Sequence, residues 1–137
     1  MISPVPWSLG VKPGSKDTWD GFAEEREEIF SLIEKENLSG VILMAADRHR
    51  TDLRKTPRPQ GYDFYEFMSS RLTNVHTHPL LENAKGSEYI FGYNKECSFG
   101  ELIFDTTKSD PEVTFRCINI DGQEIFKYIL RLNDLSK

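Results

Sequence analysis

The feature that most constrains this chain is an uninterrupted run of apolar side chains at residues 41–45, with the sequence VILMA. A run of this length is typical of a strand buried on both faces, so structure must cover it on either side. Asp47, Arg48 and His49 follow almost at once. Polar residues often do no more than mark the exit of a strand. The end of a buried strand is also a rigid position for metal ligands or catalytic groups.

The segment before this strand predicts one amphipathic helix. Apolar residues recur at helical spacing over residues 18–36, and glutamates fill the first half, near the positive end of the helix dipole. Arg26 shares the apolar stripe. This position indicates an arginine that either extends its charged end to solvent or is paired internally with Asp17 or Asp20, and a direct catalytic role is the alternative.

The segments after the strand complete an α/β pattern. Residues 51–61 predict a basic loop, residues 62–70 an aromatic-rich strand, and residues 74–87 a polar loop. The last third predicts antiparallel strands at residues 89–93, 99–105, 113–120 and 124–132. Asp121-Gly122 predicts a hairpin turn between the last two strands. Cys117 alternates in phase with Val113 and Phe115, which predicts a buried thiol.

Composition narrows the classes of partner. The 137 residues are enough for a single domain, residues 1–137, with a core that needs no disulfide bonds. The formal charge is −5, which argues against a nucleic-acid partner, because such binding needs a basic face. A basic cluster in the predicted loop is suited to attract a small anion locally. It comprises Arg48, Arg50, Arg54, Lys55 and Arg58.

Targeting signals are not evident in the sequence. No apolar run is long enough to predict a membrane span, and residues 1–6 lack the basic and apolar regions of a signal peptide. The compartment therefore stays unassigned.

Asp47 and His49 are the first candidates for metal ligands. Residues two apart in an extended segment point the same way, so we expect these two side chains to project together, with Arg48 directed elsewhere. A carboxylate and an imidazole suit Zn, Mn or Fe, and further ligands must come from other segments.

His76 and His78 form a second histidine pair in the predicted polar loop. Two surface histidines are one interpretation. If the loop folds back over Asp47 and His49, both become candidates for substrate contact or for an outer ligand set. Ser69-Ser70 follows a strand, but no nucleophile-elbow motif surrounds it, and no glycine-rich phosphate loop occurs in the chain.

Four segments in order resemble the C-terminal portion of the PhoD-like alkaline phosphatase/phosphodiesterase family, a branch of the calcineurin-like metallophosphoesterases. They are DTWDGFAEEREEIF at residues 17–30, ADRH at 46–49, YDFYEFMSSRLTN at 62–74, and SFGELIFD at 98–105 before the final hairpin. That family carries a W-x-G helix with a Glu-Arg pair, then a strand ending in G-D-x-H. Ala46 stands where the family usually has Gly.

The resemblance implies metal-dependent phosphoester hydrolysis. Asp47 and His49 match the ligand positions of G-D-x-H, and the family's metals are iron with calcium, or other divalent pairs. It further implies an α/β fold: half of the family's β-sandwich, flanked by a helix, with antiparallel β structure at the C-terminus. The family's N-terminal ligand motifs do not occur here. We therefore expect little activity from this chain alone, and self-association or pairing with the missing half. Many relatives are exported.

Three functions remain open at this stage. The chain is a metallophosphoesterase segment, or a non-catalytic interaction module descended from such an enzyme, or a small metal-binding protein. The third would use Asp47, His49, His76 and His78.

Overall fold

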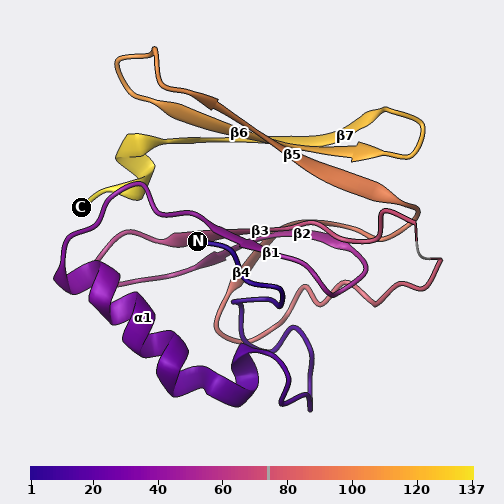
Figure 1. Ribbon diagram of the computed structural model, residues 1–137, viewed down its shortest axis with the longest axis horizontal. Helices are drawn as coiled ribbons and strands as arrows, with labels where there is room; N and C mark the ends of the chain where they lie inside the picture. The colour runs from indigo at the N-terminus through magenta and orange to yellow at the C-terminus, as the bar shows by residue number, and fades with distance from the viewer. Residues whose placement is uncertain (74) are drawn as a thin grey trace.

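The computed structural model describes residues 1–73 and 75–137, which form one short helix and two β-sheets (Figure 1). The elements in chain order are a 3-10 turn η1 (Trp19–Phe22), helix α1 (Ala23–Lys35), strands β1 (Leu43–Ala45), β2 (Thr51–Thr56), β3 (Phe64–Met68), β4 (Glu88–Tyr93), β5 (Ser98–Asp105), β6 (Glu112–Asn119) and β7 (Glu124–Arg131), and a final 3-10 turn η2 (Leu132–Leu135). The molecule is mostly β-sheet, consistent with the predicted α/β class.

Sheet A is mixed and has the order β1-β3-β2-β4. Strand β1 runs parallel to β3, whereas β2 is antiparallel to both β3 and β4. Residues at the N-terminus extend the sheet at its β1 edge, where Ile2 forms a bridge with Met44. Strands β1 and β2 therefore lie on opposite sides of β3, and the short connection between them crosses the end of β3.

Sheet B is an antiparallel meander in the order β5-β6-β7. The predicted hairpin turn is confirmed: β6 pairs with β7, and Gly122 has φ +77°, a left-handed conformation that glycine adopts without steric cost. Cys117 is fully buried, as its alternation predicts.

The two sheets share a hydrophobic core and do not close into one. Phe67 of β3 packs on Phe115 of β6, with ring centroids 5.0 Å apart. Phe91 of β4 stacks on Phe126 of β7 at 3.9 Å. Sheet A is therefore the middle layer, between sheet B and α1 (Figure 1).

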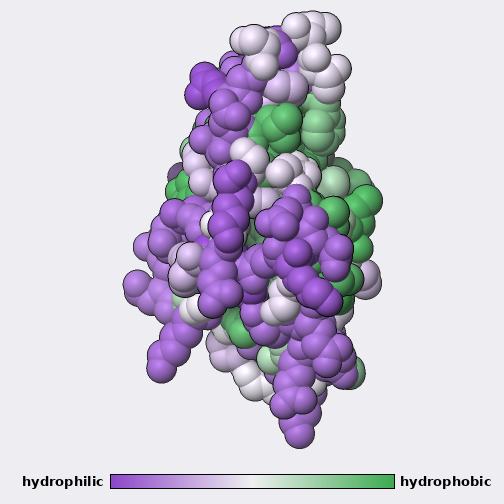
Figure 2. All heavy atoms as spheres, turned by 90° about the vertical axis from the view of Figure 1, so that its left-hand side faces the viewer, coloured by the Kyte–Doolittle hydropathy of each residue, from purple (hydrophilic) through white to green (hydrophobic). Residues whose placement is uncertain are grey.

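Helix α1 covers the other face of sheet A. Phe30 and Ile33 are buried against that face, in a cluster with Trp7, while the outward side of the helix is charged. Figure 2 shows the surface on the side of α1 and the C-terminus, and most of the side chains on it are hydrophilic. Among the described residues, no helix has the length and apolar character needed to cross a membrane.

Arg26 is buried, but its predicted partners are wrong. Its Nε donates a hydrogen bond to the Trp7 carbonyl at 2.5 Å, and the guanidinium lies 4.2 Å from the centroid of the Phe30 ring. Its ion-pair contact within the described chain is Glu27, at 4.0 Å, rather than Asp17 or Asp20. Arg26 thus joins the N-terminal segment to α1.

The predicted basic loop at residues 51–61 is wrong over its first half, which forms β2 in the interior of sheet A. Leu53 faces the core between the sheets, while Asp52 and Arg54 are buried on the opposite face. Arg54 is paired with Asp52 two residues away. Lys55 is paired with Asp63 and Glu88. These pairings make the burial of charge tolerable, and the run of polar residues in the sequence does not reveal them.

Candidate functional site

The connection between β1 and β2 holds the residues predicted as metal ligands. Asp47 has φ +77° and His49 has φ +47°, so the segment turns sharply instead of continuing the strand. The expectation of an extended segment, with both side chains projecting together, is wrong. A left-handed backbone is uncommon for residues other than glycine, although Asp and His adopt it more readily than most, and such strain often accompanies functional sites.

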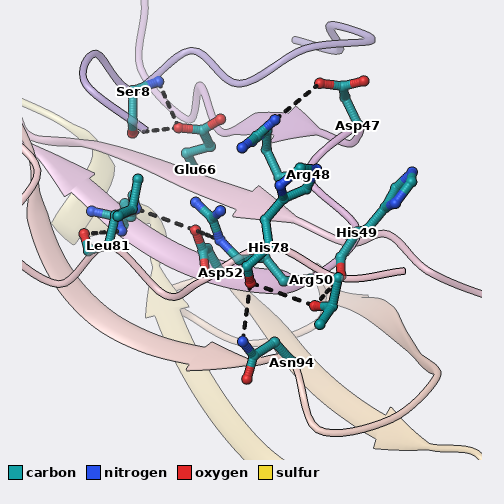
Figure 3. A network of polar contacts seen from close by, with 12 residues as sticks. Ser8, Asp47, Arg48, His49, Arg50, Asp52, Glu66, His78, Leu81 and Asn94 are labelled. Atoms are coloured by element: carbon teal, nitrogen blue, oxygen red, sulfur yellow. Dashed lines mark hydrogen bonds and ion pairs between the residues drawn. The ribbon is translucent and has the colours of Figure 1, made fainter. Parts of the chain in front are cut away.

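Asp47 lies among positive charges. Its Oδ2 is 3.7 Å from Lys12 Nζ and 4.0 Å from an Nη of Arg48, and its side chain is 38% exposed. Figure 3 shows the Asp47 carboxylate and the Arg48 guanidinium joined by this contact. The ligand role of Asp47 stays a prediction.

His49 is close to both histidines of the 69–87 segment. The ring centroids of His49 and His76 are 5.5 Å apart, those of His49 and His78 are 5.7 Å apart, and those of His76 and His78 are 4.7 Å apart. One nitrogen of each ring lies within 4.8 Å of the others. The loop therefore does fold back over His49, and we call His49, His76 and His78 the histidine cluster. Asp47 is not a member.

Two hydrogen bonds hold the backbone of this loop in place. Thr77 Oγ1 donates to the His49 carbonyl at 2.8 Å. Asn94, just after β4, donates from Nδ2 to the His78 carbonyl at 3.0 Å (Figure 3). The histidine cluster is thus fixed from two directions, which limits the reorganisation that a ligand would require.

The electrostatic surroundings of the cluster are positive. Burial lowers the pKa of His78, and the charge of Arg48 lowers it further, with smaller effects from the other two histidines and Arg50. The pKa of Arg48 is itself lowered, chiefly by burial and then by Arg50. A neutral imidazole is the form that binds metal, so these surroundings favour the ligand form of His78.

The histidine cluster fits a metal ion by its donor chemistry. Three imidazoles suit Zn, Cu, Ni or Fe, and three protein ligands with an open fourth position is a common pattern in catalytic zinc sites. The Nδ1 of His49 is buried and has no hydrogen-bond partner among the described residues. A buried polar atom of this kind is costly unless something binds it.

A second group of buried charges lies beside the histidine cluster, on β2 and on Arg50 just before it. The carboxylate of Asp52 accepts hydrogen bonds from Arg50 Nε at 2.8 Å and from Arg54 Nε at 3.4 Å. Arg54 also donates to the Leu81 carbonyl at 2.5 Å. We call Arg50, Asp52 and Arg54 the arginine–aspartate cluster.

The expected basic surface loop therefore does not exist as such. Arg48, Arg50 and Arg54 are buried. Arg58 is ion-paired with Glu27 and Glu34. Lys55 is ion-paired with Asp63 and Glu88.

Glu66 on β3 was not predicted as a special residue. It is buried, and it accepts hydrogen bonds at 2.8 Å from the backbone N–H groups of Trp7 and Ser8, and another from the Ser8 hydroxyl. Burial raises the pKa of Glu66. The signal was present in the sequence: Glu66 alternates in phase with Phe64 and Met68, which places an acid on a buried face.

Ser69 has a structural explanation. Its Oγ accepts a hydrogen bond from the backbone N–H of Gly100 at 2.7 Å, which joins the end of β3 to β5 in the other sheet. A Cβ at Gly100 would lie 3.1 Å from the Ser69 Cβ, so the end of β3 approaches sheet B closely at this point.

The model of the PhoD-like phosphatase family matches residues 2–115, which include α1, all of sheet A and β5. The chain belongs to the PhoD-like phosphatase family, as the sequence resemblance indicates. Comparisons with curated proteins and with solved structures found no match.

Proposed function

We propose that this chain is the part of a metal-dependent phosphoric ester hydrolase that supplies Asp47 and His49 to the metal centre. The observation that carries the proposal is the family match over residues 2–115, within which these two residues occupy the exit of β1. Membership of the family implies a metal-dependent phosphatase.

The residues present fit this role in chemical terms. A carboxylate at Asp47 and an imidazole at His49 are ligand types for iron, with calcium preferring the oxygen. When bound, such metals polarise the phosphate group and stabilise the charge of the transition state. Arg48, whose Nε is buried with no hydrogen-bond partner in the described chain, is placed beside Asp47 to bind a phosphate oxygen.

We further propose that this chain is a poor catalyst by itself. Two ligands are fewer than a multinuclear centre needs, and Asp47 is engaged by Lys12 and Arg48. The remaining ligands would come from another polypeptide segment that completes the family's β-sandwich, or from a second copy of the chain. Exposed apolar residues on sheet B, among them Ile103 and Ile129, support such association.

The test measures metal retention and turnover together. The chain is incubated with iron and calcium, desalted, and assayed for bound metal and for hydrolysis of p-nitrophenyl phosphate and its bis ester. Asp47→Asn and His49→Asn both tolerate the left-handed backbone. We expect each to reduce retained metal at least tenfold, with Lys127→Gln on the exposed side of β7 as the control.

Hydrolysis by the unaltered chain should stay near the blank rate. Metal retention that neither substitution alters would contradict the assignment of Asp47 and His49. Turnover that disappears in His49→Asn would show instead that the chain carries a complete site.

A further inference from the structure

We infer that the histidine cluster is a second metal site, which binds one zinc-class divalent cation through His49, His76 and His78 and without Asp47. The site shares His49 with the proposed hydrolase centre but takes its other ligands from a different segment. It requires no residues from outside this chain.

The geometry is close to that of a bound ion. Two nitrogens that bind one zinc at about 2.1 Å in a tetrahedral arrangement lie about 3.4 Å apart. The nitrogens of the histidine cluster already lie within 4.8 Å of one another. Small rotations about the side-chain bonds close the difference, since His76 is exposed and His78 is only partly buried.

The cluster also has the features of a prepared site. The chain brings together imidazoles from two segments that are far apart in sequence, and hydrogen bonds from Thr77 and Asn94 hold the backbone of both. The buried Nδ1 of His49 lacks a hydrogen-bond partner in the described part of the chain. Surface histidines that bind no ligand do not require a fixed backbone or a buried ring nitrogen of this kind.

The ligand set selects the class of metal. Three imidazoles and no carboxylate favour Zn²⁺, Cu²⁺, Ni²⁺ or Co²⁺ over Ca²⁺ and Mg²⁺, which prefer oxygen. The imidazoles bring no negative charge, and the residue before His49 in the chain is the positively charged Arg48. We therefore infer that the remaining coordination position takes an anion rather than a protein carboxylate.

The experiment is a titration of the full chain with Co²⁺, followed by visible absorption, and with Zn²⁺, followed by calorimetry. We expect one ion per chain. His76→Ala and His78→Ala should each weaken binding at least 100-fold. Asp47→Asn should change it less than threefold. Cys97→Ser is the control for thiolate binding and should also change it less than threefold. Circular dichroism of each variant checks that the fold is intact.

The outcomes separate this site from the proposed hydrolase centre. Absence of Zn²⁺ and Co²⁺ binding overturns the histidine site, while retention of iron and calcium through Asp47 would leave the hydrolase proposal standing. Binding lost in Asp47→Asn or Cys97→Ser but kept in His76→Ala also overturns it. Zinc binding that needs all three histidines in a chain that retains no iron or calcium would support the histidine site alone.

Discussion

Two polar clusters meet at His49 and Arg50, and they differ in burial, in charge and in the kind of segment that holds them. The arginine–aspartate cluster lies on β2 and on Arg50 just before it, is fully buried, and pairs two guanidinium groups with one carboxylate. Both Nη atoms of Arg50 and Oδ1 of Asp52 have no hydrogen-bond partner within the described part of the chain. The histidine cluster lies on irregular segments, is partly exposed, and leaves a buried nitrogen without a hydrogen-bond partner among the described residues. Opposite charges that are paired inside the sheet serve the fold, whereas three imidazole nitrogens that converge on one point have the arrangement that binds a metal ion.

The two clusters are not independent. Two guanidinium groups share one carboxylate on β2, so the arginine–aspartate cluster keeps a net positive charge, and Arg50 contributes to lowering the pKa of His78. The arginine–aspartate cluster therefore contributes to the electrostatic potential at the histidine cluster.

The largest expected effect tests whether the arginine–aspartate cluster is structural. Asp52→Asn leaves Arg50 and Arg54 buried without a compensating charge, and we expect the free energy of unfolding to fall by about 3–5 kcal/mol. Urea unfolding measures this loss. Asp17→Asn is the matched control, because its ion pair with Lys12 is exposed to solvent and contributes little to stability. A loss under about 1 kcal/mol for Asp52→Asn would contradict a structural role for the arginine–aspartate cluster.

The second effect concerns Glu66, the other buried acid of sheet A. Glu66→Gln sets an amide N–H against backbone N–H donors, and we expect a loss of about 1–3 kcal/mol near pH 5. Burial raises the pKa of Glu66 above its ordinary value of 4.5, so the folded protein holds this proton more tightly than the unfolded chain.

This linkage fixes the sign of the pH dependence. The stability that the bound proton contributes is fully present below the unfolded pKa and is lost as pH rises through the raised folded pKa. The stability difference between the unaltered chain and Glu66→Gln should therefore shrink as pH increases from about 4.5 upward. Unfolding curves at several pH values measure it. A difference that stays constant across that range would show that Glu66 titrates normally.

The third effect tests whether the hydrogen bond from Thr77 holds the histidine cluster in position for a metal ion. Thr77→Val removes the hydrogen bond to the His49 carbonyl, and we expect zinc affinity to fall about tenfold. Calorimetric titration measures the affinity. Thr77→Ser keeps the hydroxyl and should bind zinc like the unaltered chain. Equal affinities for the valine and serine variants would mean that this bond does not position the ligands.

The smallest effect tests the coupling between the clusters. Arg48→Gln removes a positive charge that lowers the pKa of His78, so that pKa should rise, as NMR titration of the metal-free chain can measure. Zinc affinity in the absence of added anions should increase on the order of threefold, since the repulsion of the cation is reduced. Weaker zinc binding would indicate that Arg48 acts mainly by orienting His49.

The sequence predicted the parts of the fold whose causes are local. The helix pattern, the turn at Gly122 and the alternation along β6 and β7 each depend on neighbouring residues. Strand β2 was missed because its charged residues Asp52, Arg54 and Lys55 are typical of a surface loop, and the sequence does not show that they are paired within the structure. The left-handed conformations of Asp47 and His49 were also missed, because nothing in their residue types requires them.

The sequence identified the residues of the candidate site, but it did not predict how their side chains are arranged. His49 was identified because it follows a buried strand. His76 and His78 were identified on the condition that their loop folds back over His49. Asp47 was paired with His49 because both match the G-D-x-H motif and because the segment was taken as extended, which it is not. The left-handed conformations of Asp47 and His49 change the directions of the side chains, and the spacing of residues in the sequence does not predict that change.

The order of strands in the two sheets has a consequence for how the chain folds. Sheet B joins neighbours in sequence through short turns, whereas sheet A must bring residues 2, 44 and 67 together, with β1 and β3 in parallel. Closing these longer loops loses more entropy before any contact compensates for it, so the meander is the natural nucleus. The histidines converge only when β1, β2 and the 69–87 segment are in place. The ability to bind an ion would then be among the last properties that a newly made chain acquires.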